Sequence, residues 1–177
     1  MLFYYLCQGK IRNYILLLAS IFFYAWGGVN YVPILLISIL INYTFGILIF
    51  KFNKKSNLSK LLLIIGVILN LSILFYYKYY DFTINNINNI FNSNFQLKQI
   101  VMPIGISFFT FQGMSYIIDI YRGVATVNKN PFLVALYISL FPQLVTGPIV
   151  KYKDIDSQIR NLVMELNALL SVLQKKL

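Results

Sequence analysis

Long apolar runs separated by short polar stretches dominate the 177-residue sequence. Five of these runs approach or reach the roughly 17 to 25 residues that a helix needs to cross a bilayer. They cover Tyr14 to Trp26, Tyr31 to Phe50, Leu61 to Tyr77, Met102 to Tyr121 and Pro131 to Val150. The pattern predicts an all-α, polytopic integral membrane protein with about four to five transmembrane or re-entrant helices.

The stretch from Asp81 to Gln99 differs from these runs because it is rich in asparagine. Its apolar residues recur at helical spacing, at Ile84, Ile87, Ile90 with Phe91, and Phe95. A tyrosine cluster at 76–80 precedes it, and such clusters are typical of the headgroup region. We therefore expect an amphipathic helix that lies along the membrane interface.

The last apolar segment, 131–150, is interrupted by Pro142 and by the pair Gly147-Pro148. Proline removes a backbone donor, so two structures are open: a re-entrant or broken element lining a cavity, and a proline-kinked spanning helix. If all five segments span, the basic residues divide 8 to 7 between the two sides, whereas re-entry of the fifth segment divides them 13 to 2 and re-entry of the fourth divides them 11 to 4. The positive-inside rule therefore favours a re-entrant element, with the early basic loops in the cytoplasm.

Composition narrows the class of protein further. The chain is 59% hydrophobic and 11% charged, which excludes a soluble globular enzyme, and its 17% aromatic content excludes intrinsic disorder. The net charge of +10 comes from basic residues dispersed between apolar segments, so it indicates the lipid bilayer as partner and no nucleic acid. Cys7 is the only cysteine and histidine is absent, so we expect no metal site.

The fourth segment carries the best polar constellation. Gln112, Ser115, Asp119 and Arg122 lie at i, i+3, i+7 and i+10 and therefore share one helix face. An ionisable residue inside a span normally faces a bundle interior or a cavity, so this face is a candidate wall of a substrate passage. The alternative is a structural role, in which Asp119 pairs with Arg122 and the other two side chains join neighbouring helices.

A series of short sequence motifs follows in a fixed order between about residues 10 and 160. Upstream they are Arg12-Asn13-Tyr14, Phe22-Phe23-Tyr24-Ala25-Trp26 and Ile41-Asn42-Tyr43. Downstream they are MPIGISFFTFQ over 102–112, Ser115-Tyr116, Asp119, Tyr121-Arg122-Gly123, Asn130-Pro131, ALYISLFPQL over 135–144 and Gly147-Pro148-Ile149. Together these motifs resemble the membrane-bound O-acyltransferase family, in its bacterial alginate O-acetyltransferase branch.

The resemblance implies a multi-pass enzyme of the bacterial plasma membrane that transfers an acyl group, here acetyl, to hydroxyls of a cell-surface polysaccharide. It implies a thioester donor such as acetyl-CoA or carrier-bound acetyl, although no cofactor is expected to stay bound, and polysaccharide-modification machinery as partners. The family's catalytic histidine has no counterpart here, so we name no catalytic residue. The passage candidates are Gln112, Ser115, Asp119, Gln143, Gly147 and Pro148.

The same resemblance predicts that residues 1–177 form part of an O-acyltransferase domain, its N-terminal half, without the family's first span and histidine-bearing half. We expect such a fragment to be inactive unless a second chain supplies that half. Residues 161–177 depart from the family pattern, which fits either a small out-of-frame deletion or a native amphipathic tail. The alternative function is a non-catalytic membrane scaffold or translocation subunit.

Overall fold

The computed structural model describes residues 10–52, 56–139 and 152. Every regular element among these residues is helical, which confirms the all-α prediction. The elements are α2 (Lys10–Trp26), the short 3-10 helix η1 (Val29–Tyr31), α3 (Val32–Lys51), α4 (Asn57–Lys78), α5 (Tyr80–Phe91), α6 (Ile106–Arg122) and α7 (Pro131–Ser139).

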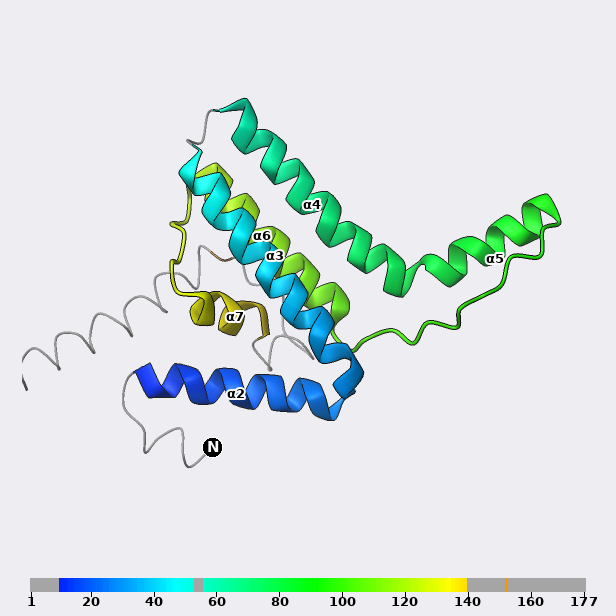
Figure 1. Ribbon diagram of the computed structural model, residues 1–177, viewed down its shortest axis with the longest axis horizontal. Coiled ribbons are helices and arrows are strands. Elements are labelled where there is room, and N and C mark those ends of the chain that lie inside the picture. The colour runs from blue at the N-terminus through cyan, green and yellow to red at the C-terminus, as the bar shows by residue number, and fades with distance from the viewer. Residues whose placement is uncertain (1–9, 53–55, 140–151, 153–177) are drawn as a thin grey trace, which may run out of the picture.

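Three helices form the centre of the described structure. α3, α4 and α6 pack against one another along their lengths, while α2 and α7 pack together and cross below them (Figure 1). α4 runs antiparallel to α6, as the 3.3 Å contact from Lys78 Nζ at the end of α4 to Ser107 Oγ at the start of α6 requires. The segment after α6 returns past α3, where the Tyr43 hydroxyl donates to the Lys129 carbonyl at 2.9 Å.

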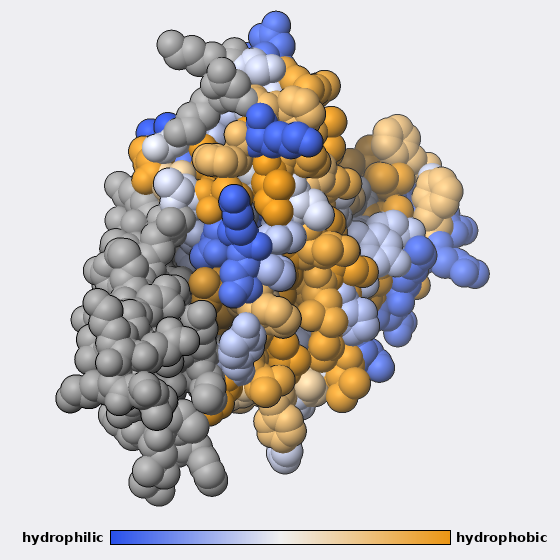
Figure 2. Space-filling view, turned by 60° about the vertical axis from the view of Figure 1, so that its left-hand side comes forward, coloured by the Kyte–Doolittle hydropathy of each residue, from blue (hydrophilic) through white to orange (hydrophobic). Residues whose placement is uncertain are grey.

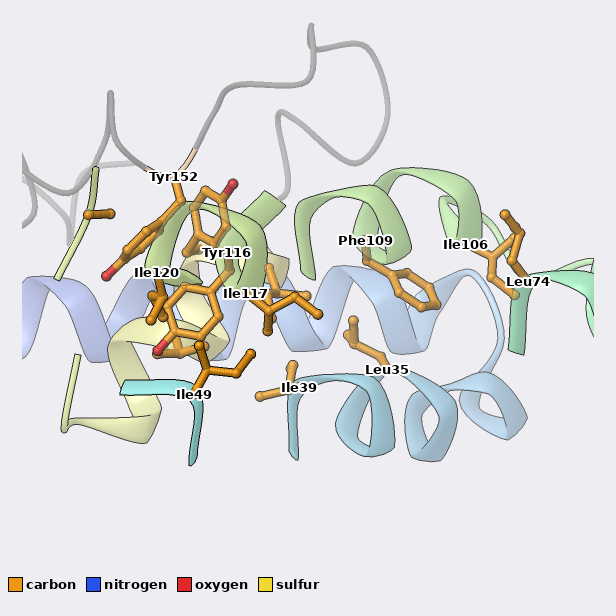
Figure 3. Packing of buried hydrophobic residues seen from close by; sticks show 14 of the residues in the cluster. Leu35, Ile39, Ile49, Leu74, Ile106, Phe109, Tyr116, Ile117, Ile120 and Tyr152 are labelled. Carbon is orange, nitrogen blue, oxygen red and sulfur yellow. The ribbon is translucent and has the colours of Figure 1, made fainter. Parts of the chain in front are cut away.

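The core of this bundle is apolar and centres on the inner face of α6. Phe109, Ile117 and Ile120 are fully buried there, against Leu35 and Ile49 of α3 (Figure 3). Because α6 contributes to contacts with both α3 and α4, its orientation decides which of its polar side chains point into the protein.

Close approach of the helices depends on small residues at two contacts. A Cβ added at Gly46 of α3 would lie 2.5 Å from Cε1 of Tyr116, and one added at Gly113 of α6 would lie 2.2 Å from Nδ2 of Asn42. These distances are far inside van der Waals contact, so only glycine permits this spacing. Small residues serve the same purpose where helices pack within membranes.

Two helices are long and apolar enough to cross a membrane: residues 29–51 and Asn57–Lys78, each with a mean hydropathy of 2.3. Only 22% of the apolar window in α4 is buried, so most of this helix presents apolar side chains outward. Figure 2 shows one face of the molecule on which hydrophobic residues form a broad, continuous surface. An exposed apolar surface of this extent supports a membrane location.

The helices of the first and fourth segments are shorter than a full span. α2 contains the short apolar segment Tyr14–Trp26 at the predicted bounds, and α6 has 17 residues. The fourth segment does not begin its helix at Met102, because Gly105 adopts a left-handed conformation (φ 74°) and α6 starts after it. Of the fifth segment, only α7 lies within the described residues, so the choice between a re-entrant and a kinked element lies outside them.

The amphipathic segment is a helix over part of its predicted length. α5 has no buried residue and projects away from the bundle (Figure 1). It ends at Phe91 because Asn92 is left-handed (φ 47°), so the prediction that the helix continues through Phe95 was wrong. The amide of Asn88 instead brackets Phe95: Nδ2 donates to its carbonyl and Oδ1 accepts from its N–H, both at 2.9 Å.

Candidate functional site

The candidate polar face lies on α6, which two glycines delimit. Gly105 precedes the helix, and its carbonyl accepts from the N–H of Phe109 at 3.1 Å. Gly123 follows it in a left-handed conformation (φ 71°), and the carbonyl of Asp119 accepts from the N–H of Val124 at 3.2 Å. Left-handed glycines commonly end helices in this way, so the sequence defines the length of the face as well as its polarity.

The structure brings Gln112 and Asp119 to the interior, as their spacing predicts. Their side chains are 1% and 5% exposed, whereas Ser115 is only half-buried at the edge of the face. Arg122 lies exposed in the last turn. Two turns of helix separate Gln112 from Asp119, a rise of about 10 Å. A buried amide and a buried carboxyl therefore lie one above the other on α6.

Gln143, Gly147 and Pro148 lie outside the described residues. The structure therefore does not test whether they meet the face formed by Gln112 and Asp119, and the role of all six residues in lining a passage stays a prediction.

Three buried tyrosines extend this face, and the sequence analysis did not select them. Tyr116 lies between Gln112 and Asp119, and its ring packs edge-on against that of Tyr152 with centroids 4.7 Å apart (Figure 3). The ring of Tyr137 of α7 also packs edge-on against that of Tyr152, with centroids 5.0 Å apart. The signal that could have found Tyr116 is its position four residues after Gln112, on the same side of the helix.

A second polar contact inside the bundle also went unpredicted. Asn42 of α3 and Asn70 of α4 form a reciprocal amide pair, with each Nδ2 donating to the partner's Oδ1 at 3.0 Å. The remaining N–H of each amide donates to its own helix, to the Ser38 and Gly66 carbonyls respectively, at 2.8 Å. Both side chains are essentially fully buried, so this pair joins α3 and α4 inside the bundle.

Among the described residues, no three of the types His, Cys, Asp and Glu lie close enough together to hold a metal ion. What α6 offers to a ligand is therefore hydrogen bonding and shape. An amide such as Gln112 can donate and accept, and a buried carboxyl such as Asp119 can accept or, when protonated, donate. Groups of this kind suit the orientation of a polar substrate inside an apolar protein.

Comparison with known proteins identifies sequences that are similar to most of this chain. The chain is 37% identical over 162 residues to a probable alginate O-acetylase, AlgI, of Pseudomonas aeruginosa, a match that covers 89% of this chain and 31% of that protein. It is 34% identical to the corresponding protein of Azotobacter vinelandii, again over 89% of this chain and 32% of the relative. The chain is a homologue of these O-acetylases.

A peptidoglycan O-acetyltransferase of Helicobacter pylori is also similar, at 34% identity over 89% of this chain and 35% of that protein. No family model matches the chain, and no solved structure matches it at a significant level. The resemblance to the alginate O-acetyltransferase branch is confirmed by these O-acetylase homologues, and the chain spans about a third of the length of the curated relatives it matches.

Proposed function

We propose that this chain is part of a multi-pass membrane O-acyltransferase that places acetyl groups on hydroxyls of a bacterial cell-surface polysaccharide. The observation that carries the proposal is the similarity of 89% of the chain to proteins named for O-acetylation of alginate and of peptidoglycan. Both of those named acceptors are carbohydrate polymers outside the cytoplasm, so a membrane-embedded chain suits such a reaction. Apolar helices long enough to cross a bilayer support that setting.

The proposed reaction joins an acceptor hydroxyl to the acyl group of a thioester such as acetyl-CoA. The hydroxyl oxygen forms a bond to the thioester carbonyl carbon, the carbon–sulfur bond breaks, and the proton released by the hydroxyl ends on the departing thiol. A base near neutrality is the usual means of moving that proton, and histidine is the side chain best suited to it. None of the 177 residues is a histidine, so the proposal assigns the base to protein outside this sequence, either a second chain or a continuation of this one.

In this proposal the polar face of α6 is part of the wall of the substrate passage. Gln112 is the strongest candidate because it is a buried, uncharged amide, 1% exposed, and an amide can both donate and accept hydrogen bonds. The buried Asp119 and the half-buried Ser115 continue the same face along α6. Acetyl transfer needs the acceptor hydroxyl and the acyl donor held in a reactive geometry, and hydrogen-bonding side chains such as these can hold them there.

A non-catalytic membrane scaffold is the second candidate function, favoured by the absence of histidine from the sequence. The two functions differ in how they depend on the α6 face. A scaffold requires the folded bundle, whereas an acyltransferase wall requires the particular polar groups.

An acetylation assay tests this difference. Membrane vesicles are prepared from a strain of the source bacterium in which the gene is deleted and then replaced by the wild-type gene or a variant. With radiolabelled acetyl-CoA outside and endogenous polysaccharide as acceptor, wild-type protein should produce base-labile label on the polymer. Gln112→Ala should lower the rate about tenfold, equivalent to the loss of about 1.4 kcal/mol in one hydrogen bond.

Thr44→Ala is the matched control, because within the described part of the chain the Thr44 hydroxyl donates only to carbonyls of its own helix, those of Leu40 and Ile41 at 2.9 Å. It should retain the wild-type rate at equal protein level. Equal labelling with wild-type protein and with Gln112→Ala would favour the scaffold. Equal labelling with and without the chain would exclude a role for this chain in acetyl transfer.

A further inference from the structure

A shallow groove of about 440 Å³ follows the outward face of α4 towards its junction with α5. The groove is lined by Ile68, Leu71, Ser72, Phe75, Tyr76 and Tyr80. The lining is apolar along most of its length and becomes aromatic and polar at the end nearest α5.

A cation is held at that polar end. The ammonium of Lys98 lies 5.4 Å from the ring centroid of Tyr76 and 5.1 Å from that of Tyr80. Both distances are within the range of cation–π attraction. Lys98 therefore places a positive charge at the aromatic end of an apolar groove.

The position of Lys98 is fixed by backbone contacts of the returning segment. The carboxylate of Asp81, in the first turn of α5, accepts from the N–H of Lys98 at 2.9 Å and from the N–H of Ile100 at 2.7 Å. Because hydrogen bonds to a charged acceptor are the stronger kind, this clamp holds the segment against the start of α5. The groove on α4 and the segment that contains Lys98 are therefore held together by specific contacts.

The dimensions of the groove match one leaflet of a bilayer. Ten residues of α4 separate Ile68 from Lys78, the last residue of that helix, a rise of about 15 Å. Half of a hydrocarbon core of about 30 Å is about 15 Å. With the tyrosine cluster at the headgroup level, as aromatic belts are, Ile68 lies close to the bilayer midplane.

We propose that this groove binds one phospholipid, with an acyl chain along Ile68, Leu71 and Phe75 and its phosphate beside Lys98. Charge complementarity at one end and an apolar channel of leaflet depth at the other identify that occupant. The proposal rests on the membrane location of α4 and is independent of acetyl transfer, so either can fail without the other.

Native mass spectrometry of the full chain, purified in detergent and stripped of lipid, tests the site. Dioleoylphosphatidylglycerol is titrated in, and dioleoylglycerol, which has the same chains and no phosphate, is titrated in parallel. The site variants are Lys98→Gln, which removes the cation, and Leu71→Trp, which fills the groove. The matched controls are Lys60→Gln and Leu61→Trp, exposed positions near the other end of α4.

The wild-type chain should bind one phosphatidylglycerol at low lipid ratios. Lys98→Gln should weaken that binding about fivefold, the usual contribution of one basic residue to an anionic lipid surface, and leave dioleoylglycerol unaffected. Leu71→Trp should lose the first bound lipid of either kind. Circular dichroism verifies that each variant keeps its helices, and Lys98→Gln changes an exposed side chain, so it tests the site even if Leu71→Trp misfolds.

Equal binding by the site variants and the control variants would overturn the proposal, since it would indicate a uniform lipid shell. Weakening of dioleoylglycerol binding by Lys98→Gln would also overturn it, because that lipid has no phosphate for the lysine to contact.

Discussion

The reciprocal amide pair between Asn42 and Asn70 gives the sharpest test of how this bundle holds together. Asn42→Ala removes both hydrogen bonds between the helices and leaves the amide of Asn70 buried with one fewer donor and one fewer acceptor to contact. Gly113 of α6 lies directly against the Asn42 side chain, since a Cβ added there would lie 2.2 Å from Nδ2. A side-chain hydrogen bond between membrane helices contributes about 0.6 kcal/mol on average and up to about 1.7 kcal/mol.

Leaving a buried polar group without its partner costs about 1 to 3 kcal/mol. We therefore expect each of Asn42→Ala and Asn70→Ala to lower the free energy of unfolding by about 2 kcal/mol. In the double variant neither amide remains to be left unpaired. Its loss should fall short of the sum of the two single losses by about 1 to 2 kcal/mol, which is the coupling that contacting residues show.

The assay is reversible unfolding in mixed micelles, with the mole fraction of denaturing detergent increased and helicity followed by circular dichroism. Thr44→Ala serves as control, since its hydroxyl donates to carbonyls of α3, and should change the free energy of unfolding by less than about 0.5 kcal/mol. Single losses that simply add in the double variant would refute the reasoning, because they would mean that the two amides do not depend on each other.

Two further predictions concern close packing and the segment beside α5. Gly46→Ala should destabilise the bundle by about 1 to 3 kcal/mol, because its Cβ meets the ring of Tyr116 at 2.5 Å. Gly27→Ala should cost less, because its Cβ meets the flexible end of Ile104 at 3.1 Å and the Tyr24 carbonyl oxygen at an ordinary contact distance of 3.4 Å; equal midpoints in the same detergent titration would contradict this. Asp81→Asn replaces one acceptor oxygen with a donor, so one of the two backbone N–H groups at positions 98 and 100 loses its partner. Amide hydrogen exchange there should accelerate about tenfold or more, given a charge-assisted bond of about 1.5 to 3 kcal/mol, and unchanged exchange would show that the carboxylate does not hold this segment.

The sequence predicts most of the helices because their signal is local. The second span was expected at Tyr31 to Phe50 and lies at Val32–Lys51, since a long apolar run has few alternatives in which to satisfy its backbone. The third begins at Asn57, four residues before the expected Leu61, because Ser56 caps it: its hydroxyl accepts from the N–H of Leu58 at 3.2 Å. A capping serine can also be recognised in a sequence, but the pattern of hydrophobic residues alone does not reveal it.

The contacts between helices could not be predicted in the same way. Asn42 and Asn70 lie 28 positions apart, and their pairing depends on how α3 and α4 are rotated and shifted relative to each other. The polar face of α6 was found from spacing alone, because Gln112 and Asp119 share a side of one helix. The meeting of Tyr116 with Tyr152 was not found, since it joins segments that are close only after folding.

The acetyl content of the cell-surface polysaccharide tests the central claim most directly. Acetate released from purified polymer by mild base is measured in the source bacterium, in a strain with this gene deleted, and in the deletion strain complemented with the chain as it stands. Acetyl transfer predicts that the deletion lowers base-labile acetate and that complementation restores it. An acetate content that stays the same in all three strains would contradict a role for this chain in polysaccharide O-acetylation.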